Sequence, residues 1–396
     1  MKRIYLDNAA ATPLDPRVKR EMDKYEKAFG NASSLYASGK GAKKIINNSR
    51  EKIAKILNAG ADEIIFTGSG TESCNLAVLG AARANKKKGK HIITTKIEHH
   101  AVLNACKQLE QEGFKITCVN VNEGGLINPE DVKKALNPNT VLVSIMYANN
   151  EIGTIQPIQQ IAKIIKNFNK QIIFHTDATQ AVGYLDLNVQ KLGIDSMSFN
   201  GSKIYGPKGA GCLYIRRGTT IQPIMFGGSQ ERGLRPGTEN TALIAGFAKA
   251  LEITDSIKEK ENNRLKKLRD YTIDKIINEI PSSKLNGSQK ERLPNNINMS
   301  FAGKDGEMLV LILDQKGVEV STGSACTSTE IRSENSGQAD PSHVLKAIRW
   351  IRASHHNQAK GESVGTGDNL RITLGRFTKK EDIDYFIKQL KNVLKS

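Results

Sequence analysis

The feature that most constrains the fold is a regular alternation of short apolar runs with helical patterns between about residues 45 and 250. The apolar runs do not alternate with polar residues, which is typical of strands buried on both faces of a sheet. Strands separated by helices of this length indicate βαβ units and a mainly parallel sheet. We expect strands at residues 64–67, 91–94, 116–119, 141–145, 172–175, 195–199 and 211–215, with helices at 72–84, 101–111 and 158–167.

The rest of the chain differs in pattern. Residues 250–280 are charged and helical, which predicts a long surface helix linking two halves. Beyond it, strands at 296–301, 318–321 and 370–374 mix with helices at 306–314 and 381–394, which predicts a smaller α+β domain. The expected domains are residues 15–260, and residues 1–14 with 261–396. Residues 354–368 are polar and Gly-rich, which predicts a mobile loop.

Composition excludes several classes of protein. The net charge is +17, but the Lys and Arg residues are spread along the chain, so we interpret them as a solvated surface and do not expect direct nucleic-acid binding as the function. The five cysteines are scattered and form no CxxC pair, which argues against a disulfide framework or a zinc site. The sequence has neither a membrane-spanning apolar run nor a secretory leader pattern, so we expect a cytoplasmic protein.

A lysine among small residues is the first candidate for chemistry. Lys203 follows an expected strand within the Gly-rich residues 200–211, where a ligand can approach the backbone closely. Such a lysine can form a Schiff base with a pyridoxal cofactor, although an ordinary lysine in a turn fits the same pattern. Asp177 ends another expected strand, where a carboxylate can hold a pyridine nitrogen protonated or simply cap a turn.

Two further motifs fall at the same expected edge of the sheet. Residues 68–73 (Gly-Ser-Gly-Thr-Glu-Ser) lie between a strand and a helix, where backbone N–H groups and the helix dipole form a seat for phosphate. His99 follows the strand at 91–94, where an imidazole can stack on a ring and transfer protons. Ligands of open α/β sheets bind at this edge, so the four features together favour a cofactor site.

Cys326 lies in residues 321–328 (Ser-Thr-Gly-Ser-Ala-Cys-Thr-Ser), which lack an apolar packing pattern. We therefore expect an exposed loop in which a nucleophilic thiol reaches a cofactor site, although an incidental loop cysteine has the same sequence pattern.

With these motifs, the chain resembles the cysteine desulfurases of the NifS/IscS type, within the class V aminotransferase family of fold type I PLP enzymes. The resemblance runs from residues 5–10 (Tyr-Leu-Asp-Asn-Ala-Ala) to residues 371–378 (Arg-Ile-Thr-Leu-Gly-Arg-Phe-Thr), and the loop around Cys326 favours the IscS-like group. It implies an α/β fold with a mainly parallel, mixed seven-stranded sheet and a smaller α+β domain. It also implies a homodimer that converts L-cysteine to L-alanine with pyridoxal 5'-phosphate.

The resemblance implies roles for the site residues. Cys326, Lys203 and His99 would be catalytic, with sulfur held as a persulfide on Cys326 and the cofactor bound covalently to Lys203. Asp177 would pair with the ring nitrogen and Gln180 with the ring hydroxyl. The implied phosphate and cofactor contacts are Gly70, Thr71, Asn150, Asn200, Ser202, His99 and, from a neighbouring subunit, Thr238. The implied substrate contacts are Arg371, Asn150 and Asn31.

This chain departs from the family pattern before the lysine, where Asn200 and Ser202 stand in place of the usual serine and histidine. The implied sulfur acceptors are partner proteins such as an iron–sulfur scaffold or a tRNA-thiolation carrier. The alternatives are a selenocysteine lyase, another PLP-dependent lyase or transaminase of the same fold, and a sulfur-transfer scaffold without catalysis. Assays of alanine production from cysteine and selenocysteine separate the enzymes, and an absorption spectrum tests for the cofactor.

Overall fold

The computed structural model describes residues 3–323, 342–348 and 369–395. Its central element is a seven-stranded sheet with the order β2-β8-β7-β6-β5-β3-β4. Strand β8 is antiparallel to both of its neighbours, and the other adjacent pairs are parallel, which confirms the expected mixed sheet. The strands are β2 (Ile64–Thr67), β3 (His91–Thr95), β4 (Lys115–Val119), β5 (Thr140–Ser144), β6 (Ile173–Asp177), β7 (Ser196–Asn200) and β8 (Gly211–Ile215).

Helices cover both faces of this sheet. In β3, Ile92 packs into a core formed with α3 (Gly70–Ala84) and α4 (His100–Gln111), whereas the next residue, Ile93, packs into the core on the other face. Successive side chains of a strand point to opposite faces, so an unbroken apolar strand is buried on both sides. The other helices of this part are α1 (Pro16–Tyr25), α2 (Ala37–Leu57), α5 (Pro129–Ala135), α6 (Ile158–Phe168) and α7 (Val189–Leu192).

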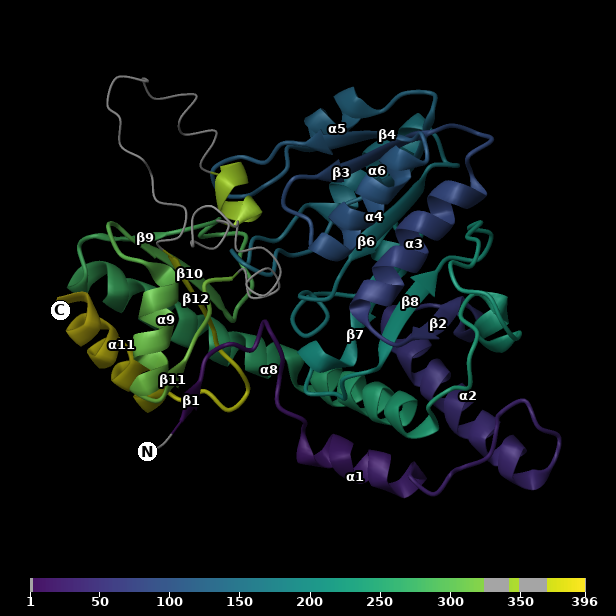
Figure 1. Ribbon diagram of the computed structural model, residues 1–396, viewed down its shortest axis with the longest axis horizontal. Helices are drawn as coiled ribbons and strands as arrows, with labels where there is room; N and C mark the ends of the chain where they lie inside the picture. Colours follow the sequence, from purple (N-terminus) through teal and green to yellow (C-terminus); the bar gives the residue numbers. More distant parts are fainter. Residues whose placement is uncertain (1–2, 324–341, 349–368, 396) are drawn as a thin grey trace.

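A second, smaller part has its own core (Figure 1). Its antiparallel sheet has the order β12-β10-β9, and a separate parallel pair joins β1 to β11. Because β1 pairs with β11, the start of the chain lies in the same part as its end. The elements are β1 (Ile4–Tyr5), β9 (Ser283–Leu285), β10 (Asn296–Phe301), α9 (Gly306–Gln315), β11 (Val318–Glu319), β12 (Asn369–Thr373) and α11 (Lys380–Lys395).

The helix between the two parts differs from the sequence expectation. Helix α8 spans Thr241–Glu279 and is 39 residues long, so it begins earlier than expected and is not a surface helix. Phe247 is buried in the core of the large part and Leu265 in the core of the small part. Most charged residues of 258–269 lie on its exposed or partly exposed side, but Arg269 is buried and donates to the Arg292 and Leu293 carbonyls. The expected domain boundary at residue 260 stays a prediction, and α8 crosses it unbroken (Figure 1).

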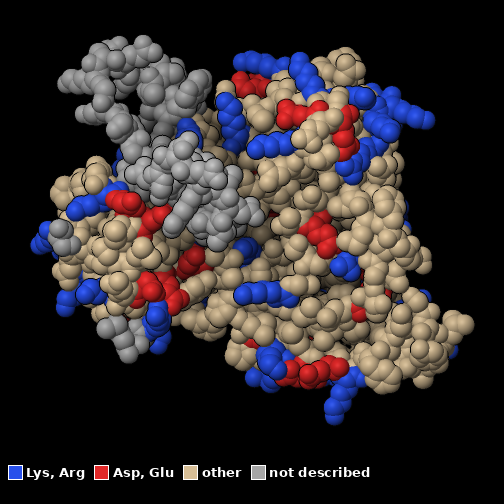
Figure 2. Space-filling view, viewed as in Figure 1, with Lys and Arg blue, Asp and Glu red and all other residues tan. Residues whose placement is uncertain are grey.

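A helical segment at residues 343–348 packs on the large part, with Val344, Leu345 and Ile348 buried in the same core as β3. Within the described ranges, no helix is both long and apolar enough to cross a membrane. Basic and acidic side chains are interspersed on the face drawn in Figure 2 and do not form one large basic surface there. Cys326 and the expected loop at 354–368 lie outside the described residues.

Candidate active site

A cavity of about 420 Å³ lies at the carboxyl ends of five strands, β2, β3, β5, β6 and β7. Its volume is in the usual range for small-molecule sites. A wider hollow of about 840 Å³ between α5 and α6 has neither Lys nor His among its lining residues, so we place the chemistry at the smaller cavity. The predicted residues that line the smaller cavity are Gly70, Thr71, His99, Asn150, Asp177, Gln180, Asn200, Lys203 and Arg371.

The first turn of α3 forms one wall of the cavity. Ser69 caps the helix by accepting a hydrogen bond from the Glu72 N–H at 3.1 Å, and Glu72 accepts one from the Gly68 N–H at 2.8 Å. Gly70 lies so close to its neighbours that a Cβ atom there would be 2.8 Å from Asn200 Nδ2. Gly70, Thr71 and Asn200 all line the cavity, and the helix dipole favours an anion at this wall.

Asp177 lies at the end of β6 with its side chain almost fully buried. Its Oδ1 accepts a hydrogen bond from the Thr179 N–H at 2.9 Å, which orients the carboxyl group. Gln180 lies nearby in the sequence and donates from Nε2 to the Ala9 carbonyl at 3.0 Å. These contacts tie the end of β6 to the N-terminal segment, and both side chains remain part of the cavity wall.

Lys203 follows β7 in a short 3₁₀ turn (Gly201–Lys203) and donates from Nζ to the Ala10 carbonyl. The turn is tightly built, because a Cβ atom at Gly201 would lie 2.8 Å from the Pro207 carbonyl oxygen. Ser202 does not line the cavity and instead donates to Asn200 Oδ1 at 3.1 Å. Its contact with the cavity is therefore indirect, through Asn200.

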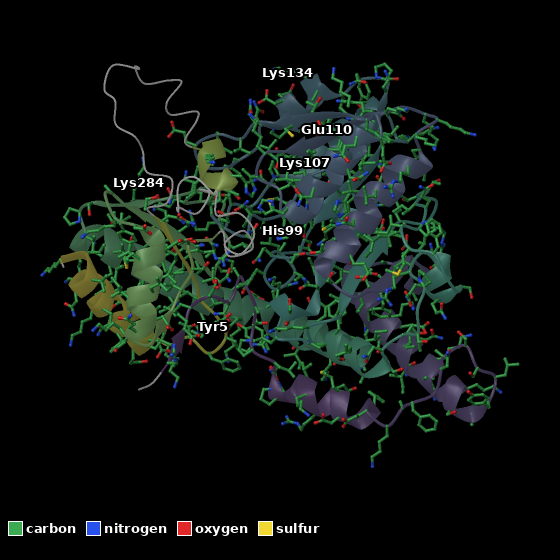
Figure 3. The ribbon with its side chains drawn as sticks, viewed as in Figure 1. Tyr5, His99, Lys107, Glu110, Lys134 and Lys284 are labelled. Atoms are coloured by element: carbon green, nitrogen blue, oxygen red, sulfur yellow. The ribbon has the colours of Figure 1, made fainter. Side chains whose placement is uncertain are left out.

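Three histidines, His99, His100 and His343, line another wall of the cavity. His99 caps α4, and its Nδ1 accepts a hydrogen bond from the Ala101 N–H at 3.1 Å, so the proton of the neutral ring lies on Nε2. Figure 3 places His99 where the two parts face each other. The rings of His100 and His343 are 4.8 Å apart, and His343 Nε2 donates to the Glu98 carbonyl at 2.9 Å. Burial lowers the pKa of both His100 and His343, which favours their neutral forms.

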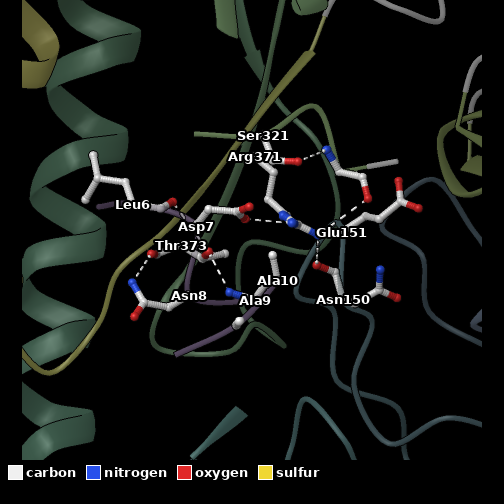
Figure 4. Close-up of polar contacts among 12 residues, drawn as sticks. Leu6, Asp7, Asn8, Ala9, Ala10, Asn150, Glu151, Ser321, Arg371 and Thr373 are labelled. Atoms are coloured by element: carbon white, nitrogen blue, oxygen red, sulfur yellow. Dashed lines mark hydrogen bonds and ion pairs between the residues drawn. The ribbon is translucent and has the colours of Figure 1, made fainter. Parts of the chain in front are cut away.

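Arg371 is the cation contributed by the small part (Figure 4). It lies on β12, is 3% exposed, and donates from Nη2 to Asp7 Oδ1 at 2.7 Å. From Nη1 it donates to the carbonyls of Asn150 at 3.2 Å and Gly323 at 3.4 Å. A fixed guanidinium facing a cavity is suited to binding a substrate carboxylate.

Some predicted residues lie elsewhere. Thr238 is exposed and does not line the cavity, although the nearby Arg235 donates to Glu72 at 2.9 Å and so ties this segment to α3. Asn31 is partly buried before α2, where its side chain accepts from the Ser33 N–H at 2.9 Å, and it is also outside the lining. Their roles stay predictions.

Sequence reasoning missed Glu151 and His343, which both line the cavity. Glu151 directly follows Asn150, which was predicted, so its place in the sequence could have pointed to it. No pattern around His343 marks a strand end. Of the described cysteines, Cys74, Cys106 and Cys212 are buried and Cys118 is exposed, and Cys74 is the one among these four that lines the cavity.

Comparisons with known proteins agree with this geometry. The model of the aminotransferase class-V family matches residues 4–386. The chain belongs to this family. It is 49% identical to a cysteine desulfurase IscS from Dictyoglomus turgidum, an alignment that covers 100% of this chain and 95% of that protein. The family and fold that the resemblance implied are therefore confirmed.

Two solved structures of this family are similar over nearly their whole length. A NifS-like protein superposes with a TM-score of 0.89 at 35% identity, covering 99% of each chain. SspA in complex with cysteine superposes with a TM-score of 0.77 at 35% identity, covering 95% of this chain and 99% of that one.

Proposed function

We propose that the protein is a cysteine desulfurase. It takes the sulfur of L-cysteine, releases L-alanine and holds the sulfur as a persulfide on Cys326 for transfer to an acceptor protein such as an iron–sulfur scaffold or a tRNA-thiolation carrier. The observation that carries the proposal is the convergence of Lys203, Asp177, His99 and Arg371 on one cavity. The names of the similar proteins support the same activity.

The cavity residues fit pyridoxal 5'-phosphate. The space next to Gly70 and the N-terminus of α3 suit its phosphate, with Thr71, Asn200 and Ser202 in support. The buried carboxylate of Asp177 suits its pyridine nitrogen, Gln180 its ring hydroxyl and His99 its ring face. When bound, this cofactor supplies an electron-withdrawing ring that stabilises negative charge on the substrate Cα.

Each of the proposed catalytic and binding side chains has a separate role in the reaction. Lys203 holds the cofactor and moves the proton at Cα, and Arg371 binds the substrate carboxylate with Asn150 beside it. His99 is placed to transfer a proton near the substrate sulfur. The Cys326 thiolate attacks that sulfur, so an S–S bond forms, the Cβ–S bond breaks, and protons complete alanine. Cysteine and the enzyme thiol thus give alanine and the enzyme persulfide, with atoms and electrons balanced.

The proposal includes a homodimer in which Thr238 contacts the cofactor of the neighbouring subunit. Large apolar side chains are exposed before this segment and between α1 and α2, including Phe226 at 84% and Phe29 at 89%. Exposed apolar surface of this kind marks a protein interface. Sedimentation of the purified protein tests this, and a monomer at working concentration contradicts it.

The test of the function compares two thiols. Cys326→Ser removes the proposed sulfur acceptor, so alanine production from L-cysteine falls to background, while the absorbance of bound cofactor stays because Lys203 is intact. Cys118→Ser changes an exposed thiol that does not line the cavity and keeps full activity. Full alanine production by the Cys326 variant would refute the assignment.

A further inference from the structure

Both ends of the segment that carries Cys326 approach one buried carboxylate. Gly323 and Ser342 are the described residues that flank residues 324–341. Ser342 donates from Oγ to Glu151 Oε2. A Cβ atom at Gly323 would lie 3.2 Å from the same oxygen. The carboxylate thus accepts a hydrogen bond from Ser342, and Gly323 lies so close to the Glu151 side chain that a side chain of its own would be crowded there, although the two flanking residues are far apart in sequence.

The position of Glu151 is itself fixed from both parts of the molecule. Its N–H donates to Asn149 Oδ1 at 2.8 Å, and its carbonyl accepts from Nδ2 of Asn296 and of Asn298, each at 3.2 Å. Asn296 and Asn298 belong to β10 in the small part, whereas Asn149 follows β5 in the large part. The side chain is 3% exposed and faces the cavity. Such a residue is a rigid anchor.

The two flanking residues have further contacts that orient the chain. Arg371 donates to the Gly323 carbonyl, and the Gly323 N–H donates to Ser321 Oγ at 3.0 Å (Figure 4 labels Arg371, Ser321 and Glu151). Ser342 Oγ accepts from the Leu345 N–H at 3.1 Å, which caps the helical segment 343–348 on the large part. The Ser342 hydroxyl thus links this segment to Glu151.

The ionisation of the Glu151 carboxyl group is consistent with its role as an anchor. Burial raises the pKa of Glu151, but the Ser342 hydroxyl, Arg371, His100 and His99 all favour the ionised form.

We propose that Glu151 is a positioning residue that holds both ends of the segment bearing Cys326 and thereby sets how the thiol is delivered to the cavity. This inference rests on the proposed function. Glu151 takes no part in breaking the Cβ–S bond. It acts through Ser342 and Gly323, so its loss affects sulfur capture more than substrate binding.

The test uses Glu151→Ala, Ser342→Ala and their double variant in the full-length protein, with Ser342→Thr as the variant that keeps the hydroxyl. Glu63→Ala is the control, because Glu63 is also a buried carboxyl with backbone partners but lies outside the cavity lining. In the holoenzyme, each single alanine variant of the pair lowers the single-turnover rate of persulfide formation about tenfold or more, with KM for cysteine nearly unchanged. The double variant is no slower than Glu151→Ala, because the two side chains act as one unit.

A second readout does not need the cofactor. In the cofactor-free protein, Glu151→Ala and Ser342→Ala both speed hydrogen exchange at the Leu345 amide, and Ser342→Thr restores protection. If Glu151→Ala does not fold, Glu151→Gln gives the same comparison with the side-chain volume kept. Unchanged Leu345 exchange, or additive losses in the double variant, overturn the inference. Failure of the unmodified holoenzyme to form a Cys326 persulfide overturns the proposed function instead.

Discussion

At the residue scale, a buried carboxyl precedes the two histidines that line the cavity on α4. Glu98 is fully buried, and its Oε1 accepts hydrogen bonds from Thr95 Oγ1 at 2.8 Å and the Met146 N–H at 2.9 Å. Its Oε2 has no hydrogen-bond partner in the part of the chain that the structure describes. Burial raises the pKa of Glu98 to about 8, so the folded protein favours the neutral acid.

This shift predicts a pH dependence of stability. The pKa in the folded protein lies above the ordinary value of 4.5, so the contribution of Glu98 is full below that value and is lost as the pH rises through about 8. Glu98→Gln stays neutral and keeps an acceptor for Thr95 and Met146. Its melting temperature therefore falls less than that of the unmodified protein between about pH 5 and about pH 9. Parallel pH profiles in thermal unfolding would contradict the shift.

The site residues that lie at strand ends could be predicted from the sequence. Lys203, Asp177 and His99 each follow an apolar run, so a parallel sheet must bring them to one edge. His343 could not be found in this way, because it reaches the cavity from a short helical segment whose packing on the large part is tertiary.

At the scale of elements, the sequence predicted the strands better than the helices. The bounds expected for β2, β8 and β10 agree with the structure, because β2 and β8 are short, mainly apolar runs and β10 alternates polar and apolar residues. The start of helix α8 was misjudged, because its first turns are mostly apolar and so carry no clear amphipathic pattern. Its start at Asn240 is set by a side-chain cap to the Leu243 N–H at 3.0 Å.

Helix α3 gives a prediction at this scale. A larger residue at Gly70 fills the space beside Asn200 and Thr179, where a Cβ atom would already lie 2.8 Å and 3.1 Å from side-chain atoms. Gly70→Val therefore weakens binding of pyridoxal 5'-phosphate to the cofactor-free protein about tenfold or more, as measured by absorbance titration.

The matched control is Gly41→Ala in α2, where a Cβ atom would have no neighbour within 4 Å. Alanine favours a helix over glycine by about 0.5–1 kcal/mol, so this variant is slightly stabilised and binds the cofactor normally. Equal cofactor affinity in the Gly70 and Gly41 variants would argue against a phosphate seat at α3.

At the scale of the whole molecule, the cavity is complete only where the two parts meet. The large part supplies Lys203, Asp177 and His99, and the small part supplies Arg371 and Gly323. Helix α8 is continuous through both cores and so fixes one part against the other. The sequence indicated two parts, but their contact depends on side-chain interactions between distant segments, such as Arg371 with the Asn150 carbonyl. Local patterns do not encode such contacts.

At the centre of the proposed function, the sulfur of free L-cysteine is bound as a persulfide on the Cys326 thiol. The most direct measurement treats the cofactor-loaded protein with one equivalent of L-cysteine, followed by alkylation, digestion and mass spectrometry of every cysteine peptide. We expect one added sulfur atom on the Cys326 peptide, an equal amount of alanine, and no added sulfur on the Cys118 peptide. Alanine formed without added sulfur on Cys326 would contradict it.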